Sequence, residues 1–384
     1  MNIENFIIER LGHEKFKKTG NTVNLQFHEL IGKVYLKFPK LKVVIVAGTN
    51  GKGQVTKSLS RSLVSSGFSV LRWTSPHLRS LSERFVYNEN EFDLDKLENK
   101  LKSEIQNSFY KEDNYSYYEF LFYQFLKISL DLEKLDYLIL EVGLGGRLDS
   151  VNLLNGDYSV LTSISRDHKE VLGERFDGIL YEKLGVTRTG SPHVSGLISD
   201  YLLEKEKDYC VKNRITHYQF PELKKMKSYF ERNEYLVKKL IDLINEDTAN
   251  HQKARYDPAG DSPFTEIGGF SFNTAHNLDG YREVMKTVDR FERVYIGFSN
   301  RDEKELRSIL SLIKSFLKAK VTLVSFEHHR ALDEKKCAVL AKDYQFDFVK
   351  YSSFSDRIEE IIKTKCLITG SNYFVGKVLQ EHTS

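Results

Sequence analysis

The chain has 384 residues, which exceeds one ordinary hydrophobic core and predicts two or three domains, or one large domain with an appendage. Apolar residues make up 40% and aromatic residues 12%, so packed cores are expected and wholesale disorder is excluded. A net charge of +3 is close to balanced at this length and does not favour nucleic acid or a membrane surface as the main partner.

The N-terminal segment 1–16 is interrupted by the charged residues Glu4, Glu9 and Arg10. It lacks the apolar core of a signal peptide and the length of a membrane span, and we expect a cytoplasmic protein. The cysteines are odd in number and widely spaced, which favours reduced, packed thiols over disulfides or a zinc site. They are Cys210, Cys337 and Cys366.

Short β-branched runs alternate with longer amphipathic segments along the chain. This alternation predicts α/β architecture, with mainly parallel sheets covered by helices on both faces. The first series of expected strands is 41–47, 68–73, 135–142 and 158–164, with helices over 94–109 and 117–130. The second series is 268–275, 293–299, 320–327 and 365–372, with helices that begin near Asp279, Asp302 and Asp333.

A polar stretch at 245–263 contains Pro and Gly and shows no periodicity. Such a composition is typical of a connection between domains. We therefore predict a first domain over 1–252 and a smaller second domain over 253–384.

The stretch "VVIVAGTNGKGQVTKSL" (43–59) reads as a strand, a glycine-rich turn and a helix. A helix N-terminus after such a turn presents backbone N–H groups that suit phosphate oxygens. Gly48 and Gly51 allow a close backbone approach, and Lys52 offers its ammonium to phosphate. The common phosphate-loop pattern fails at Val46 and Gly53. The alternative is an ordinary glycine-rich turn.

Polar residues follow three further predicted strands. Ser75 comes after 68–73, Glu141 ends the next strand, and Asp167 and His168 follow 158–164. Because open α/β sheets bind ligands at the carboxyl ends of their strands, we expect these groups to converge on one crevice. Taken singly, each could instead belong to a tight turn or a hydrogen-bonded loop.

With these segments in order, the sequence resembles the folylpolyglutamate synthase and dihydrofolate synthase family of the Mur ligase superfamily. The matching pieces are "VAGTNGKG", "TSPHL" with "ERF", "SYYEFL", "LEVGLGGRLDSVN", "TSISRDHKEVLG", "EKLG", "ERNEYL", "AHNLDG" and "ITGSNY". They span residues 46 to 373 in family order. The first and fourth pieces are the most specific.

The resemblance implies a Mur-ligase-like ATPase domain over 1–252 and a Rossmann-like glutamate ligase domain over 253–384. It implies a reaction of folate metabolism, in which ATP phosphorylates a pterin or folate carboxylate and L-glutamate then attacks the acyl phosphate. ATP, two Mg²⁺ ions and a carbamylated Lys183 are the implied cofactors. The partners are small molecules, and we expect a monomer.

The resemblance also assigns roles to individual residues. The implied nucleotide-binding residues are Thr49, Asn50, Gly51, Lys52, Gly53, Asn233, Arg255 and Asn273. The implied Mg²⁺ ligands are Ser75, Glu141 and His168, and the implied catalytic residues are Lys52, Lys183 and His276. The implied substrate-binding residues are Tyr117, Tyr118, Glu119, Phe120, Leu148, Asp149 and Ser150. The tyrosines and Phe120 could equally be core residues of an amphipathic helix, and Lys183 could be a surface lysine.

Two departures from the family pattern stand in the nucleotide region. Gln54 replaces a serine after "GKG", and Asn273 replaces an aspartate. Either the chain is a diverged folate ligase that tolerates these changes, or it is a paralogue that joins a different carboxylate and amine. A non-catalytic nucleotide-binding subunit is a third reading, which the retained Lys52, Ser75 and Glu141 argue against.

Overall fold

The computed structural model describes 21–106, 115–167, 169–247, 252–257, 264–267, 270–286 and 288–382, together with Ile7. The chain forms two compact units: Met1–Lys227 with Glu231–Ala259, and Ser228–Phe230 with Gly260–Ser384. The domain boundary expected after residue 252 falls within 248–263, where only 252–257 are described. None of the described helices combines the length and the apolar content that a bilayer crossing requires.

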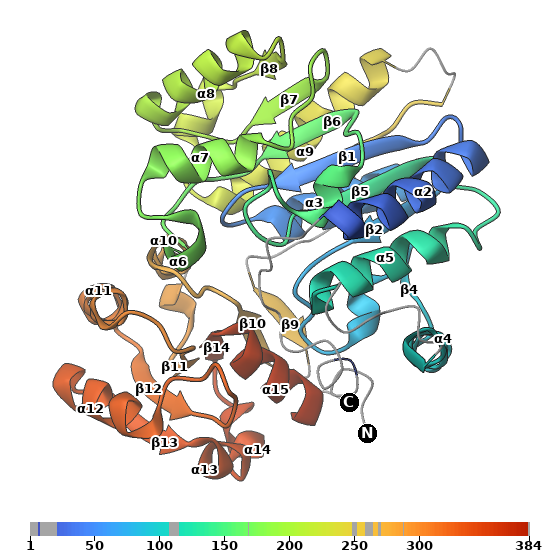
Figure 1. The fold of residues 1–384 in the computed structure, drawn as a ribbon. Coiled ribbons are helices and arrows are strands. Elements are labelled where there is room, and N and C mark those ends of the chain that lie inside the picture. The colour runs from blue at the N-terminus through green and yellow to red at the C-terminus, as the bar shows by residue number, and fades with distance from the viewer. Residues whose placement is uncertain are drawn as a thin grey trace. The chain divides into compact units, whose positions relative to one another are not determined.

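The first unit is built on an eight-stranded sheet with the order β4-β3-β2-β5-β1-β6-β7-β8 (Figure 1). The pairs β2–β5, β5–β1, β1–β6, β6–β7 and β7–β8 are parallel, whereas β3 pairs antiparallel with both β2 and β4. The strands are β1 (Lys42–Ala47), β2 (Val70–Trp73), β3 (Val86–Tyr87), β4 (Asn90–Glu91), β5 (Tyr137–Glu141), β6 (Tyr158–Leu161), β7 (Pro192–Ser195) and β8 (Thr216–Tyr218).

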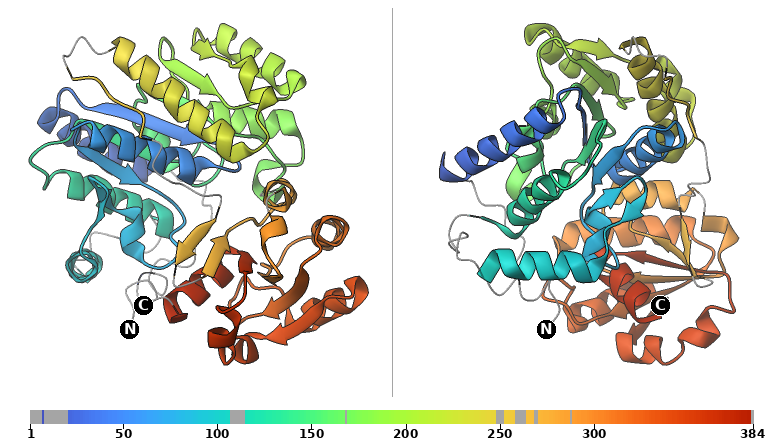
Figure 2. Two further views of the ribbon diagram at one scale, coloured as in Figure 1. Left: turned by 180° about the vertical axis from the view of Figure 1, so that it is seen from behind. Right: turned by 90° about the vertical axis from the view of Figure 1, so that its right-hand side faces the viewer.

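Helices cover both faces of this sheet (Figures 1 and 2). The α-helices are α2 (Asn21–Lys37), α3 (Lys52–Ser65), α4 (Leu94–Gln106), α5 (Tyr117–Ser129), α6 (Lys169–Leu172), α7 (Phe176–Leu184), α8 (Asp200–Lys212) and α9 (Tyr229–Asp247). Three short 3₁₀ helices lie between them: η1 (Leu81–Arg84), η2 (Ser150–Leu153) and η3 (Pro221–Lys225).

The side chains of β1 point alternately to the two faces of the sheet, and this explains why helices cover both faces. Val43 and Ile45 pack into a core with α2 and α5, whereas Val44 and Val46 pack into a second core with α3 and α9. Successive side chains of a strand point to opposite faces, so a fully apolar strand needs partners on both sides.

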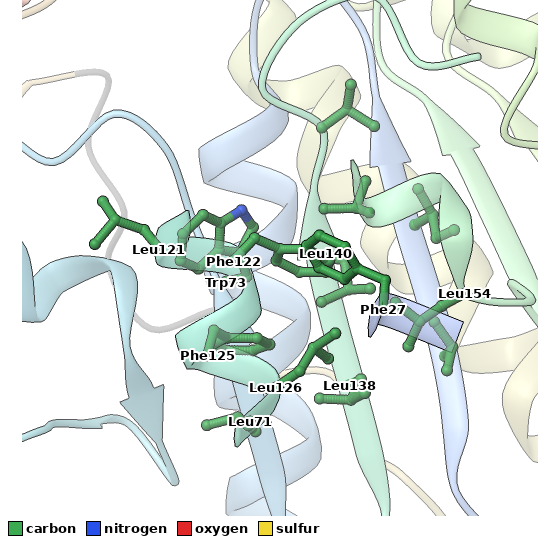
Figure 3. Close-up of a cluster of buried hydrophobic side chains, with 14 of the residues drawn as sticks. Phe27, Leu71, Trp73, Leu121, Phe122, Phe125, Leu126, Leu138, Leu140 and Leu154 are labelled. Atoms are coloured by element: carbon green, nitrogen blue, oxygen red, sulfur yellow. The ribbon is translucent and has the colours of Figure 1, made fainter. Parts of the chain in front are cut away.

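The core under α5 is rich in aromatic rings (Figure 3). Trp73, at the end of β2, is fully buried; it has an edge contact with Phe122 at a centroid distance of 5.4 Å and packs against a tilted Phe125 ring at 5.3 Å. Phe27 of α2 stacks on Phe122 at 6.0 Å. This packing fixes the carboxyl end of β2, from which Ser75 follows.

The second unit has a six-stranded sheet in the order β13-β12-β11-β14-β10-β9, parallel except for β9. Its strands are β9 (Thr265–Ile267), β10 (Phe270–Asn273), β11 (Arg293–Gly297), β12 (Lys320–Ser325), β13 (Asp347–Lys350) and β14 (Cys366–Gly370). Its helices are α10 (Leu278–Met285), η4 (Val288–Arg290), α11 (Glu303–Phe316), α12 (Glu334–Tyr344), α13 (Tyr351–Ser355), α14 (Ile358–Ile361) and α15 (Asn372–His382).

The expected α/β class, with a mainly parallel sheet and a smaller second α/β unit, is confirmed. Asp302 and Asp333 are the N-caps of α11 and α12, as predicted. The helix expected to begin near Asp279 is confirmed as α10, with Asp279 in its first turn; its N-cap is Asn277, which accepts from Gly280 N at 2.8 Å. All three cysteines are buried and free of disulfides, as expected.

Candidate active site

The glycine-rich loop joins β1 to α3. Gly51 has φ +89°, and an ideal Cβ there would lie 2.2 Å from Asn233 Nδ2. A Cβ on Gly48 would lie 1.9 Å from Thr162 Oγ1. Both positions therefore require glycine. No side chain in the described part of the chain caps the α3 N-terminus, so its first backbone N–H groups suit an anion.

The loop is held against the end of β6. Thr49 N donates to Ser163 O at 2.9 Å, and Asn50 N donates to Ser163 Oγ at 2.9 Å. Thr162 Oγ1 in turn donates to Asn50 O at 2.7 Å. The backbone donors of Thr49 and Asn50 thus position the loop, and their contact with phosphate stays a prediction.

Ser75 and Glu141 come together at the ends of β2 and β5. Ser75 N donates to Glu141 Oε2 at 3.2 Å, and the Glu141 residue is 5% exposed. Burial raises the pKa of the Glu141 carboxyl, while the nearby Lys52 ammonium opposes this rise. Ser75 Oγ is buried and has no hydrogen-bond partner among the described residues. An oxygen without a donor beside a buried carboxylate is a set of ligands that suits Mg²⁺.

The third predicted metal ligand, His168, lies outside the described residues. Across the described ranges, no three His, Cys, Asp or Glu side chains gather as a metal site. The fit to a divalent cation therefore rests on Ser75 and Glu141.

Lys183 lies inside the unit, not on its surface. It is 5% exposed, and its Nζ donates to Gly48 O at 2.9 Å. Burial, followed by repulsion from Lys52, lowers the pKa of the Lys183 ammonium to about 7. Near neutral pH, much of this side chain is therefore an uncharged amine, the form that reacts with CO₂.

Tyr118 and Asp149 belong to a buried hydrogen-bond network. Trp73 Nε1 donates to Tyr118 Oη at 3.1 Å, and Tyr118 Oη donates to Asp149 Oδ1 at 3.1 Å. Asp149 Oδ2 also accepts from the backbone of Gly143 and Leu144 at 2.9 and 3.0 Å. The network fixes the glycine-rich turn after β5 next to Glu141.

The other predicted substrate residues lie in varied environments. Tyr117 and Phe120 are core residues with 2% and 0% exposure, which favours the core alternative for them. Glu119 closes a capping box with Ser116 at the start of α5. Ser150 is buried in η2, and Leu148 is exposed. Contact of these residues with a substrate stays a prediction.

Asn233 is brought to the loop, whereas Arg255 is not. Asn233, in α9, is 2% exposed and lies against Gly51. Arg255 N donates to Ser66 Oγ, at the C-terminal end of α3. Since a helix rises about 1.5 Å per residue, Ser66 is roughly 20 Å from Lys52 along α3. The exposed Arg255 therefore lies away from the loop in this structure.

Asn273 and His276 follow β10 in the second unit. Asn273 Oδ1 accepts from Ala275 N at 2.7 Å, and His276 Nδ1 contacts Thr274 O at 2.8 Å. Both side chains order the turn between β10 and α10. Their predicted roles toward nucleotide and substrate stay predictions.

Sequence reasoning assigned no role to Arg84, which lies beside the Ser75 loop. Arg84 is 2% exposed, and its Nε donates to His77 Nδ1 at 2.9 Å. Its guanidinium also faces the rings of Trp73 and Tyr117. The sequence offers one signal for a buried Arg84: it directly precedes the apolar residues Phe85 and Val86.

Comparison with known proteins supports the family resemblance. The chain is 34% identical over 204 residues to the dihydrofolate synthase/folylpolyglutamate synthase of Buchnera aphidicola, covering 53% of this chain and 46% of that protein. It is 24% identical over 403 residues to the Bacillus subtilis protein of that name, covering 88% and 90%. The chain spans about half the length or less of the curated relatives it matches above 30% identity. No family model matches.

Solved structures match over nearly the whole chain. The bifunctional folylpolyglutamate synthase/dihydrofolate synthase of Yersinia pestis has a TM-score of 0.75 at 21% identity and covers 99% of this chain and 98% of its own. The Mycobacterium tuberculosis folylpolyglutamate synthase has a TM-score of 0.77 at 18% identity, with coverages of 94% and 95%. The resemblance to the folylpolyglutamate synthase and dihydrofolate synthase family is thus confirmed in sequence, over part of the relatives' length, and in fold, over nearly all of the chain.

Proposed function

We propose that this chain is an ATP-dependent ligase that joins L-glutamate to the carboxylate of a pterin- or folate-like acceptor. The observation that carries the proposal is the convergence of the uncapped α3 N-terminus, Glu141 with Ser75, and the buried Lys183 at the carboxyl ends of β1, β2 and β5. Solved relatives support it, since a bifunctional folylpolyglutamate synthase/dihydrofolate synthase has been seen with Mn, AMPPNP and L-glutamate bound.

In the proposed reaction, a carboxylate oxygen of the acceptor attacks the γ-phosphorus of ATP and ADP leaves. The glutamate nitrogen then attacks the acyl carbon, phosphate leaves, and the nitrogen loses a proton. The chain's task is to position the phosphates and balance their charge. The α3 N-terminus and Lys52 would hold the phosphates, and Glu141 with Ser75 would hold Mg²⁺. When bound, the ion would supply positive charge at the transferring phosphoryl group.

Carbamylation of Lys183 is part of the proposal. Its neutral amine would add to CO₂, forming an N–C bond and releasing one proton, and the side chain would become an anion. Its lowered pKa and its position against the loop backbone support this step. Asn233 as a nucleotide contact and the predicted roles of His276 and Asn273 belong to the same proposal.

An ADP-release assay tests the function. Purified protein receives Mg·ATP, L-glutamate and one acceptor from a panel of dihydropteroate, tetrahydrofolate and unrelated aryl carboxylates. We expect release only with a pterin- or folate-linked acid, together with the glutamyl product by mass spectrometry. Turnover only with an unrelated acid would replace the folate assignment with the paralogue reading, and no turnover with any acid would reject the ligase.

A further inference from the structure

One residue, Glu83 of η1, holds the segment that carries Ser75 at both of its ends. Before Ser75, Thr74 Oγ1 donates to the backbone oxygen of Glu83 at 2.9 Å. After Ser75, the Glu83 carboxylate accepts from three consecutive backbone N–H groups. These are Leu78 N, Arg79 N and Ser80 N, at 3.0, 2.7 and 3.0 Å. Both anchors of the segment 74–80 thus belong to the same residue.

The Glu83 carboxylate does more than cap η1. Ser80 and Glu83 form a capping box at the start of this 3₁₀ helix, and a capping box requires only the bond from Ser80 N to the carboxylate. The bonds from Leu78 and Arg79 are additional, and they hold the loop between β2 and η1. Hydrogen bonds to an ionised carboxylate are roughly twice as strong as those between neutral groups. The Glu83 side chain is 19% exposed, so solvent reaches only a small part of it.

Ser75 depends on these anchors for the direction of its hydroxyl. Its own N–H donates to Glu141 Oε2 at 3.2 Å, and the next residue is Pro76, which has no N–H to donate. Ser75 Oγ makes no hydrogen bond with any described residue. Because no bond of its own fixes this oxygen, its position follows the backbone that carries it, and Glu83 holds that backbone.

We propose that Glu83 is a positioning residue, which orients Ser75 Oγ toward a divalent cation bound beside Glu141. The inference rests on the proposed function, because it assumes that Ser75 and Glu141 are metal ligands. Groups that orient metal ligands typically change the affinity for the metal by about 10- to 100-fold when they are removed. Loss of the Glu83 carboxylate should therefore weaken metal binding. The phosphate loop should keep its shape, since residues 162 and 163 hold it.

Binding of Mn²⁺, measured by electron paramagnetic resonance with the ATP analogue AMPPNP present, tests this inference. Glu83→Ala removes all three carboxylate bonds and should weaken Mn²⁺ binding by about tenfold or more. Glu83→Gln keeps the shape, but its NH₂ end cannot accept from a backbone N–H, so we expect a smaller loss. ADP binding in EDTA should stay within about twofold of the wild type in both variants, because no metal takes part.

A double-mutant cycle separates positioning from a general loss of structure. Ser75→Ala removes the hydroxyl that Glu83 is proposed to orient. If Glu83 acts through this hydroxyl, adding Glu83→Ala to Ser75→Ala should weaken Mn²⁺ binding by no more than about twofold further. Equal losses in the two backgrounds, or unchanged Mn²⁺ binding in folded Glu83→Ala, would overturn the inference and leave the ligase proposal intact.

Glu91→Gln is the matched control. Glu91 accepts from Ser82 Oγ at 2.6 Å and so also holds η1, but this bond lies outside the segment 74–80. The variant should bind Mn²⁺ as the wild type does, and thermal unfolding should show that every variant is folded. A loss in Glu91→Gln as large as that in Glu83→Ala would contradict the inference. Wild-type protein that binds ADP but no Mn²⁺ would reject the proposed metal site and this inference with it, and binding of neither would reject the proposed function as well.

Discussion

Glu206 and Glu141, both buried in the first unit, differ in how their charge is compensated. Glu206 of α8 is fully buried, and it accepts from Ser195 Oγ at 2.5 Å while His193 Nε2 and His217 Nε2 lie 3.1 and 3.2 Å away. Burial alone raises its pKa, but the two histidines outweigh burial and lower the pKa to about 2. For Glu141 the effect of burial exceeds the opposing effects of Lys52 and the Ser75 backbone, and the pKa is raised.

The difference separates a structural charge from a functional one. Both oxygens of Glu206 are satisfied by side chains, so that its charge stabilises the fold. Glu141 has a single donor among the described residues, the backbone of Ser75, and Ser75 Oγ beside it is unsatisfied. A buried charge that the protein leaves incompletely paired indicates a place where a ligand completes the set.

The largest expected effect on turnover comes from removing the charge of Glu141, the glutamate that we assign to the active site. Glu141→Gln keeps the shape and removes the charge, so turnover should fall by about 10³-fold or more, which corresponds to several kcal/mol of transition-state stabilisation. The free energy of unfolding should stay the same or increase, because a poorly paired buried charge is removed. ADP release and urea denaturation measure the two quantities. Near-normal turnover would show that Glu141 is not part of the site.

Glu206→Gln should reverse this pattern. The variant loses the anion that both histidines and Ser195 contact, and it should lose about 3 kcal/mol of unfolding free energy. Below its melting temperature, its turnover should match the wild type within about twofold, since the side chains that Glu206 contacts are Ser195, His193 and His217 and none of these belongs to the candidate site. A loss of activity without a loss of stability would place Glu206 in the site instead.

The difference in unfolding free energy between the wild type and Glu206→Gln should depend on pH. The pKa of folded Glu206 is lowered to about 2, below that of the unfolded side chain. Its stabilisation is therefore complete above about pH 4.5 and is lost as the pH falls toward 2. The stability gap between wild type and Glu206→Gln should be constant from pH 7 to 5 and should shrink from pH 4.5 downward. A gap that widens in acid would contradict the assignment.

Lys183→Met should stabilise the protein. Because the pKa of folded Lys183 is lowered to about 7, the wild type bears the full cost of a buried ammonium below pH 7 and is relieved as the pH rises toward 10.5. In CO₂-free buffer, the variant should be more stable by about 2 kcal/mol at pH 6, and this gain should fade at high pH. Added bicarbonate should stabilise only the wild type. An equal gain in unfolding free energy at pH 6 and pH 10 would show that a buried ammonium is not the cause of the gain.

The smallest effect belongs to a charge at the surface. Lys127 Nζ pairs with Glu104 Oε1 at 2.6 Å, with side-chain exposures of 31% and 26%. Lys127→Met should cost no more than about 0.5 kcal/mol, and 1 M salt should abolish the difference. A larger cost would mean that ion pairs in this protein are strong in general, and would weaken the contrast between Glu141 and Glu206.

The sequence predicted what depends on local chemistry or on strand order. Asp302 and Asp333 were found because an N-cap bonds within its own turn. Ser75 and Glu141 were brought together by the rule that parallel strands end at one edge, and their strands β2 and β5 are indeed neighbours.

What escaped prediction depends on distant partners. The Glu206 cluster joins residues from β7, α8 and β8, and no periodicity marks it. No strand was predicted at β7 or β8, and each is only three or four residues long. The hydrogen bonds of Gln54 with Asn233 and Glu234 could not be read from its position, because these partners lie 179 and 180 residues further along the chain.

The Tyr118 hydroxyl has a consequence for how this chain can change. It joins Trp73, 45 residues earlier, to Asp149, 31 residues later, and through them the turn next to Glu141. Each of these side chains depends on the hydrogen that another one gives or takes. A library that randomises positions 73, 118 and 149 together should therefore recover working combinations that substitutions tested one at a time would miss.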